Sequence, residues 1–433
     1  MSDEPPRVSA VCISAPASAY LDALRAVAAN LVLVSHVLLL YFPNQYHYRG
    51  GSAAVVIFFL LSGFLISRSM LDWATRPNPR LPGFLADRVA RIMTPFVPVL
   101  VLVALLNVFV IESRMGGAGL NTGIASFIGN LLMLHDYPGF QMLERMHADM
   151  WWRIRPYNAA EPFWTVAVEF WLYIAVGLFF FCVLLKETVR RSYLWSLTAL
   201  SVPVLLWNTV AGGGESLTLV WMFGALAAYL IARAQSGGTA VALGTLSLCL
   251  VGCGSMALAA RSATAGFDPY NLQIALLMAL VMFGALVGLN GMDHSPRWLA
   301  KPASFFASYS YSLYLTHNTV LVAVAERTQS LPTWGSIVIG VVLAQLIAWL
   351  VYLGFERHYR TVARWLRPVF VRVLAPAADV GIRHSTTPTL PAGSLPFRVR
   401  TNHQMKTQWC DIGVKLELVN STHDAGETDI RTS

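Results

Sequence analysis

Two ionisable side chains, Arg25 and His36, lie eleven residues apart on the first apolar segment of the chain. Eleven residues of α-helix make three turns plus about 20°, so both side chains leave the same helix face, separated by a rise of roughly 16 Å. That rise is about half of the ~30 Å hydrocarbon core of a bilayer. The spacing predicts a cation near one membrane surface and an imidazole near the midplane. Ionisable groups at that depth are costly and typically mark a functional site.

A second pair of candidate residues, Arg88 and Arg91, lies three residues apart and therefore on one helix face. Two guanidinium groups at a membrane surface can bind phosphate through paired donors. Both arginines would also serve as ordinary cytoplasmic anchors of a spanning helix. On this pair alone the anchoring interpretation is favoured.

A candidate acid, Glu169, follows Pro162 by seven residues, about 10 Å into a predicted spanning helix. A carboxylate at that depth needs a partner or a proton. Its depth is comparable to that of His36, so the two side chains could approach each other. Pairing with an arginine, or solvation in an outer vestibule, is the open alternative.

Two further patterns have both a packing and a binding interpretation. Ser62 and Gly63 let another backbone approach closely or leave room for a ligand, and the packing interpretation is favoured. Ser310, Tyr314 and His317 share a helix face by their spacing of four and three. This polar strip suits the hydroxyl groups of a sugar, and it equally suits hydrogen bonds between helices.

The composition indicates that a membrane positions these residues. The chain has 433 residues, of which 56% are hydrophobic and 12% charged, about half of the charged fraction of soluble proteins. We therefore predict an all-α, polytopic membrane bundle of about ten transmembrane helices. The expected spans are residues 21–42, 52–71, 92–111, 163–185, 193–210, 217–232, 239–260, 272–290, 303–325 and 335–355.

Charge asymmetry orients the predicted bundle. Residues 124–135 are too short to span comfortably and are predicted to form an interfacial or re-entrant helix. With ten spans, most Lys and Arg residues fall in loops on the side of the N-terminus, which predicts that both termini are cytoplasmic. The net charge of +8 then reflects topology, and no nucleic-acid partner is expected.

Three regions follow from this pattern. Residues 1–19 form a polar cytoplasmic segment without the features of a cleavable signal peptide. Residues 20–372 form the transmembrane domain. Residues 373–433 are polar and rich in Pro, Thr and Ser, and we expect a largely disordered cytoplasmic tail. The five cysteines show no spacing that suggests a disulfide framework or a metal site, so no metal is expected.

Five motifs in this order resemble the acyltransferase-3 family of bacterial integral-membrane acyltransferases. They are Arg25 with ten intervening residues to His36, and residues 58–66, 88–92, 163–169 and 310–317. The resemblance runs from about residue 20 to 355. It implies a multi-pass enzyme of the bacterial inner membrane, in a stand-alone form without an added hydrolase-like domain.

The resemblance implies O-acylation, typically O-acetylation. The donor would be cytoplasmic acyl-CoA, typically acetyl-CoA, and the acceptor a hydroxyl of an extracytoplasmic glycan, a lipid-linked saccharide or a macrolide-like molecule. The residues expected to bind the donor are Arg25, Ser62, Gly63, Arg88 and Arg91, and those expected to bind the acceptor are Trp164, Tyr314 and His317.

The catalytic residues implied are His36 and Glu169. A neutral imidazole is a competent base for a sugar hydroxyl at physiological pH, and Glu169 would orient His36 or stabilise its imidazolium. Attack on the thioester could be direct or could pass through an acyl-enzyme.

Two other classes of function compete with this one. Buried His, Glu and Tyr residues could form the path of a proton-coupled transporter of a small molecule. The two halves of the chain, however, show no matching polar pattern of the kind that inverted repeats produce. A non-catalytic scaffold or sensor would require nearly every polar group to be a packing feature.

Overall fold

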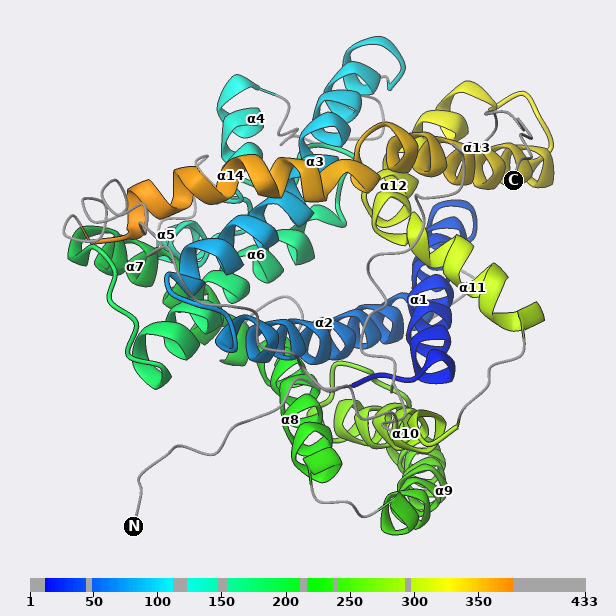
Figure 1. The fold of residues 1–433 in the computed structure, drawn as a ribbon. Coiled ribbons are helices and arrows are strands. Elements are labelled where there is room, and N and C mark those ends of the chain that lie inside the picture. Colours follow the sequence, from blue (N-terminus) through cyan, green and yellow to red (C-terminus); the bar gives the residue numbers. More distant parts are fainter. Residues whose placement is uncertain are drawn as a thin grey trace, which may run out of the picture. The chain divides into compact units, whose positions relative to one another are not determined.

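The computed structural model describes residues 12–43, 49–111, 123–146, 154–210, 216–236, 240–292 and 297–376. Within these ranges the chain forms helices and no strand, which confirms the predicted class (Figure 1). Residues 1–388 form one compact unit, to which every described residue belongs, and residues 389–433 form another. The predicted N-terminal segment and C-terminal tail therefore lie largely outside the described residues.

The described part of the chain folds into a succession of helices. In order they are α1 (Ala15–Tyr41), α2 (Gly50–Ala74), α3 (Arg80–Phe109), α4 (Ile124–Leu131), α5 (Pro138–Met146), α6 (Phe163–Leu178) with its π-helical extension η2 (Phe179–Leu184), α7 (Arg191–Val210), α8 (Leu217–Ser236), α9 (Ala240–Ala265), α10 (Leu272–Asn290), α11 (Arg297–Ser308), α12 (Ser310–Arg327), α13 (Thr333–Gly354), the 3₁₀ turn η3 (Glu356–His358) and α14 (Tyr359–Leu374).

Nine of the described helices are long and apolar enough to cross a membrane. The predicted span that is not among these nine, residues 303–325, corresponds to two helices, because α11 ends at Ser308 and α12 begins after Tyr309. Helix α12 is more polar than the other spans, yet Ser312, Thr316 and His317 are all buried. It packs against α1, α3 and α13, so its polar side chains face other helices instead of lipid.

Between α3 and α6, none of the described helices is long enough to be a candidate span. Helix α4 has only eight residues, too few to span a bilayer. His135, just after α4, stacks on Phe96, which lies about midway along the 30-residue α3. The chain therefore folds back to the middle of α3 before α6 begins, as a re-entrant segment would.

Helices α2 and α8 make the closest backbone contact described. A Cβ on Gly63 would collide with the carbonyl oxygen of Trp221, and a Cβ on Gly224 would collide with that of Leu60. Small residues permit such close approach between membrane helices. Gly63 therefore contributes to the packing of α2 on α8.

Two contacts hold the end of α3 that carries Arg88 and Arg91. The Glu187 carboxylate accepts hydrogen bonds from the backbone N–H groups of Arg80 and Leu81 at 2.8 and 3.0 Å, and so caps the first turn of α3. Helix α14 packs along α3 (Figure 1), where Arg367 donates two hydrogen bonds to Asp87 at 2.9 and 3.1 Å.

Candidate active site

Several predicted site residues meet around one cavity of about 170 Å³, which we call the arginine cavity. Its walls come from α1, α2, α3, α6 and α12. The predicted residues that line it are Arg25, Ser62, Arg88, Arg91, Glu169 and Tyr314. The tertiary structure thus brings arginines that lie more than sixty residues apart in the sequence to the same wall as the buried acid of α6.

The three arginines of this cavity differ in how close their nearest carboxylate partner lies. Arg91 lies 3.1 Å from a carboxylate oxygen of Glu356. The Asp22 carboxylate lies 3.8 Å from Arg25, on the same helix. The Nε of Arg88 is buried and has no hydrogen-bond partner among the described residues. A buried donor without an acceptor is unfavourable, so the cavity is suited to an anionic group that would accept from Arg88.

Glu356 is a residue of this site that sequence reasoning missed. Its side chain is fully buried, and its second carboxylate oxygen accepts from the backbone N–H and the hydroxyl of Ser312 at 3.2 and 2.6 Å. It therefore ties Arg91 to the first turn of α12. The available signal was an acidic residue among the arginines that follow the last predicted span.

Glu169 belongs to a hydrogen-bonded cluster at the wall of the cavity. Its carboxylate bonds with the side chains of Ser62 and Tyr173, whose hydroxyl oxygens lie 2.7 Å apart. The indole N–H of Trp221 donates to the Ser62 hydroxyl at 3.1 Å. Tyr173 and Trp221 were not predicted as site residues, because each is an ordinary aromatic residue in an apolar segment.

The first-helix imidazole pairs with a second histidine. The Nδ1 atoms of His36 and His317 each lie 3.0 Å from a backbone carbonyl oxygen, that of Val32 and that of Leu313 respectively. Since a carbonyl only accepts, both Nδ1 atoms carry a proton. The one proton on Nδ1 of His36 is therefore shared between the Val32 carbonyl and Nε2 of His317, which lies 3.3 Å away. In the neutral form of His36, this tautomer leaves Nε2 with a lone pair, as a general base requires.

This histidine pair lies beside the arginine cavity instead of in its wall. The ring of His317 is 6.0 Å from that of Tyr314, which is itself 5.6 Å from the ring of Phe58. Tyr314 and Phe58 both line the cavity, and the Tyr314 hydroxyl bonds with Thr165 at 2.6 Å. Tyr314 is therefore the cavity residue that lies next to His317, and the partner of His36 is His317 instead of Glu169.

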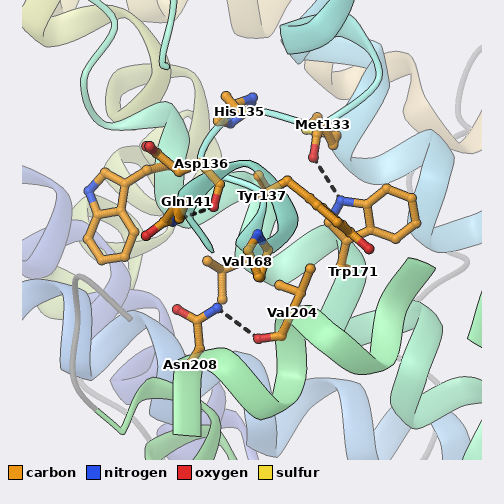
Figure 2. A pocket seen from close by; sticks show the side chains of 12 residues that line it. Met133, His135, Asp136, Tyr137, Gln141, Val168, Trp171, Val204 and Asn208 are labelled. Carbon is orange, nitrogen blue, oxygen red and sulfur yellow. Dashed lines mark hydrogen bonds between the residues drawn. The ribbon is translucent and has the colours of Figure 1, made fainter. Parts of the chain in front are cut away.

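The remaining predicted residues lie elsewhere. Gly63 faces α8. Trp164 lines a second cavity of about 250 Å³, which we call the aromatic cavity (Figure 2). It is formed by residues 133–138, α5, α6 and α7. Sequence reasoning did not anticipate this cavity, because its walls come from three separate segments of the chain, residues 133–141, α6 and α7. No group of His, Cys, Asp or Glu that could hold a metal ion occurs in the described part of the chain.

Comparisons with known proteins agree with the motifs. A family model described as an acyltransferase domain matches residues 18–353. An O-acetyl transferase of Shigella phage Sf6 is 30% identical over 160 residues, which are 36% of this chain and 44% of the relative. The chain thus spans less than half of the length of that relative. No solved structure matches the chain.

Proposed function

Because the chain belongs to the acyltransferase-3 family, we propose that it is a multi-pass O-acetyltransferase of the bacterial inner membrane. In this proposal it uses acyl-CoA, typically acetyl-CoA, and transfers the acyl group to a hydroxyl of a saccharide or saccharide-lipid on the far side of the membrane. The observation that supports the proposal is the arginine cavity, which is lined by three arginines and a buried acid, with the histidine pair beside its lining residue Tyr314.

The donor end of the proposal rests on charge. Coenzyme A carries several phosphate groups, and guanidinium groups bind phosphate through charge-assisted hydrogen bonds. Arg25 forms a 3.8 Å ion pair with Asp22, and the Nε of Arg88 has no hydrogen-bond partner among the described residues. Arg91 is held in position by Glu356. We assign these three arginines to the phosphates and the Ser62 hydroxyl to the thioester arm. Gly63 supports the donor site through the packing of α2.

The chemistry assigned to His36 is general-base catalysis. Its Nε2 takes the proton of the acceptor hydroxyl while the hydroxyl oxygen forms a bond to the thioester carbonyl carbon. The C–S bond then breaks and the sulfur of coenzyme A leaves as a thiolate. The thiolate takes up the proton that His36 removed from the acceptor hydroxyl. His317 accepts from Nδ1–H of His36 and so holds the reactive tautomer.

The role assigned to Glu169 changes with its position. Glu169 lines the arginine cavity beside Ser62 and Tyr173, so we assign it to the thioester end of the reaction instead of to the orientation of His36. Tyr314 lines the same cavity and lies next to His317, and we propose that the acceptor hydroxyl approaches along Tyr314 and His317.

A transfer assay tests the proposed function. Membranes that contain the protein are incubated with acetyl-CoA labelled in the acetyl group, and label is measured in the saccharide and lipid fractions against membranes without the protein. We expect protein-dependent label in a fraction from which mild alkali releases it, as for an ester. Well-inserted protein with no transfer of label to any fraction would contradict the proposal.

A further inference from the structure

The aromatic cavity has a lining of a different chemical character from that of the arginine cavity. Tyr137, Trp164 and Trp171 supply aromatic faces, and Figure 2 shows Tyr137 and Trp171 near each other in its wall. The indole N–H of Trp171 donates to the carbonyl oxygen of Met133 at 2.7 Å, which fixes the plane of the ring. Polar side chains converge on the same space, namely His135, Asp136, Gln141 and Asn208.

The charge of this lining excludes an anionic ligand. None of the described residues that line the cavity is Lys or Arg, so a phosphate or carboxylate group would find no counter-ion there. A neutral ligand with several hydroxyl groups would instead find amide and carboxylate partners around a largely aromatic floor, the usual composition of a small-molecule site. The C–H groups on the face of a sugar ring pack well on the electron-rich face of an indole.

His135 contributes an acceptor that lacks a donor. Its Nε2 lies 2.7 Å from the carbonyl oxygen of Phe163 and therefore carries the proton. Its Nδ1 is buried and has no hydrogen-bond partner among the described residues. Burial lowers the pKa of His135 to about 4, so the ring is neutral at physiological pH. A hydroxyl group brought by a ligand would satisfy this acceptor.

The backbone of the lining loop is held in an unusual conformation. Met133 and Asp136 have φ values of 56° and 53°, in the left-handed region that residues other than Gly rarely adopt. The Asp136 carbonyl oxygen accepts from the Gln141 side chain at 2.6 Å, and its N–H donates to Ile154 at 2.8 Å. Such strain persists where surrounding contacts hold it, and it concentrates at ligand sites.

The two cavities lie on opposite faces of α6. Thr165, Glu169 and Tyr173 face the arginine cavity, whereas Trp164 and Trp171 face the aromatic cavity. At about 100° per residue these two sets point in opposite directions. A ligand in the aromatic cavity is therefore one helix away from the proposed site of the thioester, and it is not the reacting group itself.

We propose that the aromatic cavity binds one non-reacting, hexose-sized ring of a saccharide acceptor, through stacking on Trp164 and Trp171 and hydrogen bonds to His135 and Asn208. The identification of this sugar as part of the acceptor rests on the proposed function. Binding of a remote part of a substrate supplies free energy that an enzyme can use at the reacting centre.

The test measures sugar binding apart from catalysis. The protein is placed in lipid nanodiscs, free of glycoside detergents, and titrated with methyl α-glucoside, methyl α-galactoside and methyl α-rhamnoside in the millimolar range. Binding is followed by calorimetry. The variants are Asn208→Leu, which removes an amide from the lining, and Ala167→Phe, which fills the cavity from α6. Thr209→Val is the matched control, because its hydroxyl bonds within α7 and it does not line the cavity.

We expect saturable binding of at least one hexoside to the wild type and to Thr209→Val. Asn208→Leu should weaken that binding about fivefold or more, as loss of one hydrogen bond does, and Ala167→Phe should abolish it. The proposal would be overturned if none of the three sugars binds the wild type, or if both cavity variants bind the sugar as tightly as the wild type does. Either result would count even where acetyl transfer is observed. Sugar binding without any acetyl transfer would overturn the proposed function, and with it the assignment of the sugar to an acceptor.

Discussion

The two cavities on either face of α6 differ more in charge than in size. The arginine cavity, of about 170 Å³, is lined by three arginines and a buried glutamate. The aromatic cavity, of about 250 Å³, is lined mainly by aromatic, amide and apolar side chains, with Asp136, His135 and no Lys or Arg among its described residues. A single helix thus separates a site suited to a polyanion from a site suited to a neutral, hydroxyl-rich molecule. This difference would let one protein distinguish a donor from an acceptor by charge.

The largest effect is expected from His36, which lies in neither wall. Replacement by Ala removes the lone pair of Nε2, and the transfer rate should fall about 10²- to 10⁴-fold, the usual contribution of a general base. Binding of acetyl-CoA and of hexosides should stay unchanged, because both cavities are intact. The measurement is turnover of labelled acetyl-CoA together with calorimetry on the same preparation. Turnover at the wild-type rate would exclude His36 as the base.

The second prediction concerns His135 of the aromatic cavity and the dependence of folding stability on pH. The pKa of His135 is lowered by burial to about 4, whereas an unfolded histidine has a pKa near 6.5. Between these values the unfolded state binds the proton more tightly. Stability should therefore fall as the pH drops from about 6.5 towards 4, by at most about 3 kcal/mol.

The control for this pH effect is His135→Gln, which keeps a donor for the Phe163 carbonyl and does not titrate. Thermal unfolding of wild type and variant is compared from neutral pH to about pH 4. The difference in stability between the two proteins should change with pH in the stated direction. A constant difference would show that His135 does not titrate on unfolding.

A third prediction concerns the packing of α2 against α8. The substituted residue, Gly63, lines neither cavity. Gly63→Ala would place a methyl group against the backbone of α8, and the free energy of unfolding should fall by about 2 kcal/mol. Gly335→Ala is the matched control, because a Cβ there meets open space. Thermal unfolding in the presence of lipid is the measurement. Equal melting temperatures for the two variants would mean that α2 and α8 separate easily.

The smallest effect, and the sharpest test of the charge difference, comes from Arg88→Gln. The KM for acetyl-CoA should rise about tenfold, through loss of one charge-assisted hydrogen bond. Hexoside binding should not change, since Arg88 lies in the arginine cavity alone. Arg88 is preferred to Arg91, whose removal would leave the buried Glu356 without its cationic partner. An unchanged KM would leave Arg88 as a topological anchor.

Local patterns were enough to predict the helical class and most of the spans. They also singled out Arg25, Arg88, Arg91 and Glu169, which the fold places around one cavity. The reason is that a charged side chain within an apolar run is conspicuous wherever it finally lies. The break at Tyr309 was not predicted, because the apolar pattern continues through it.

Amino-acid types and spacing by themselves determined that this chain is a membrane bundle with a few costly polar groups at its centre. Only the tertiary structure decided which of those groups meet. His36 and His317 are 281 positions apart, and Ser62 and Tyr173 are 111 apart. The order of helices along the chain does not specify such neighbours, because helix packing depends on the shapes of whole surfaces. The same holds for the aromatic cavity, whose walls come from three segments that share no local pattern.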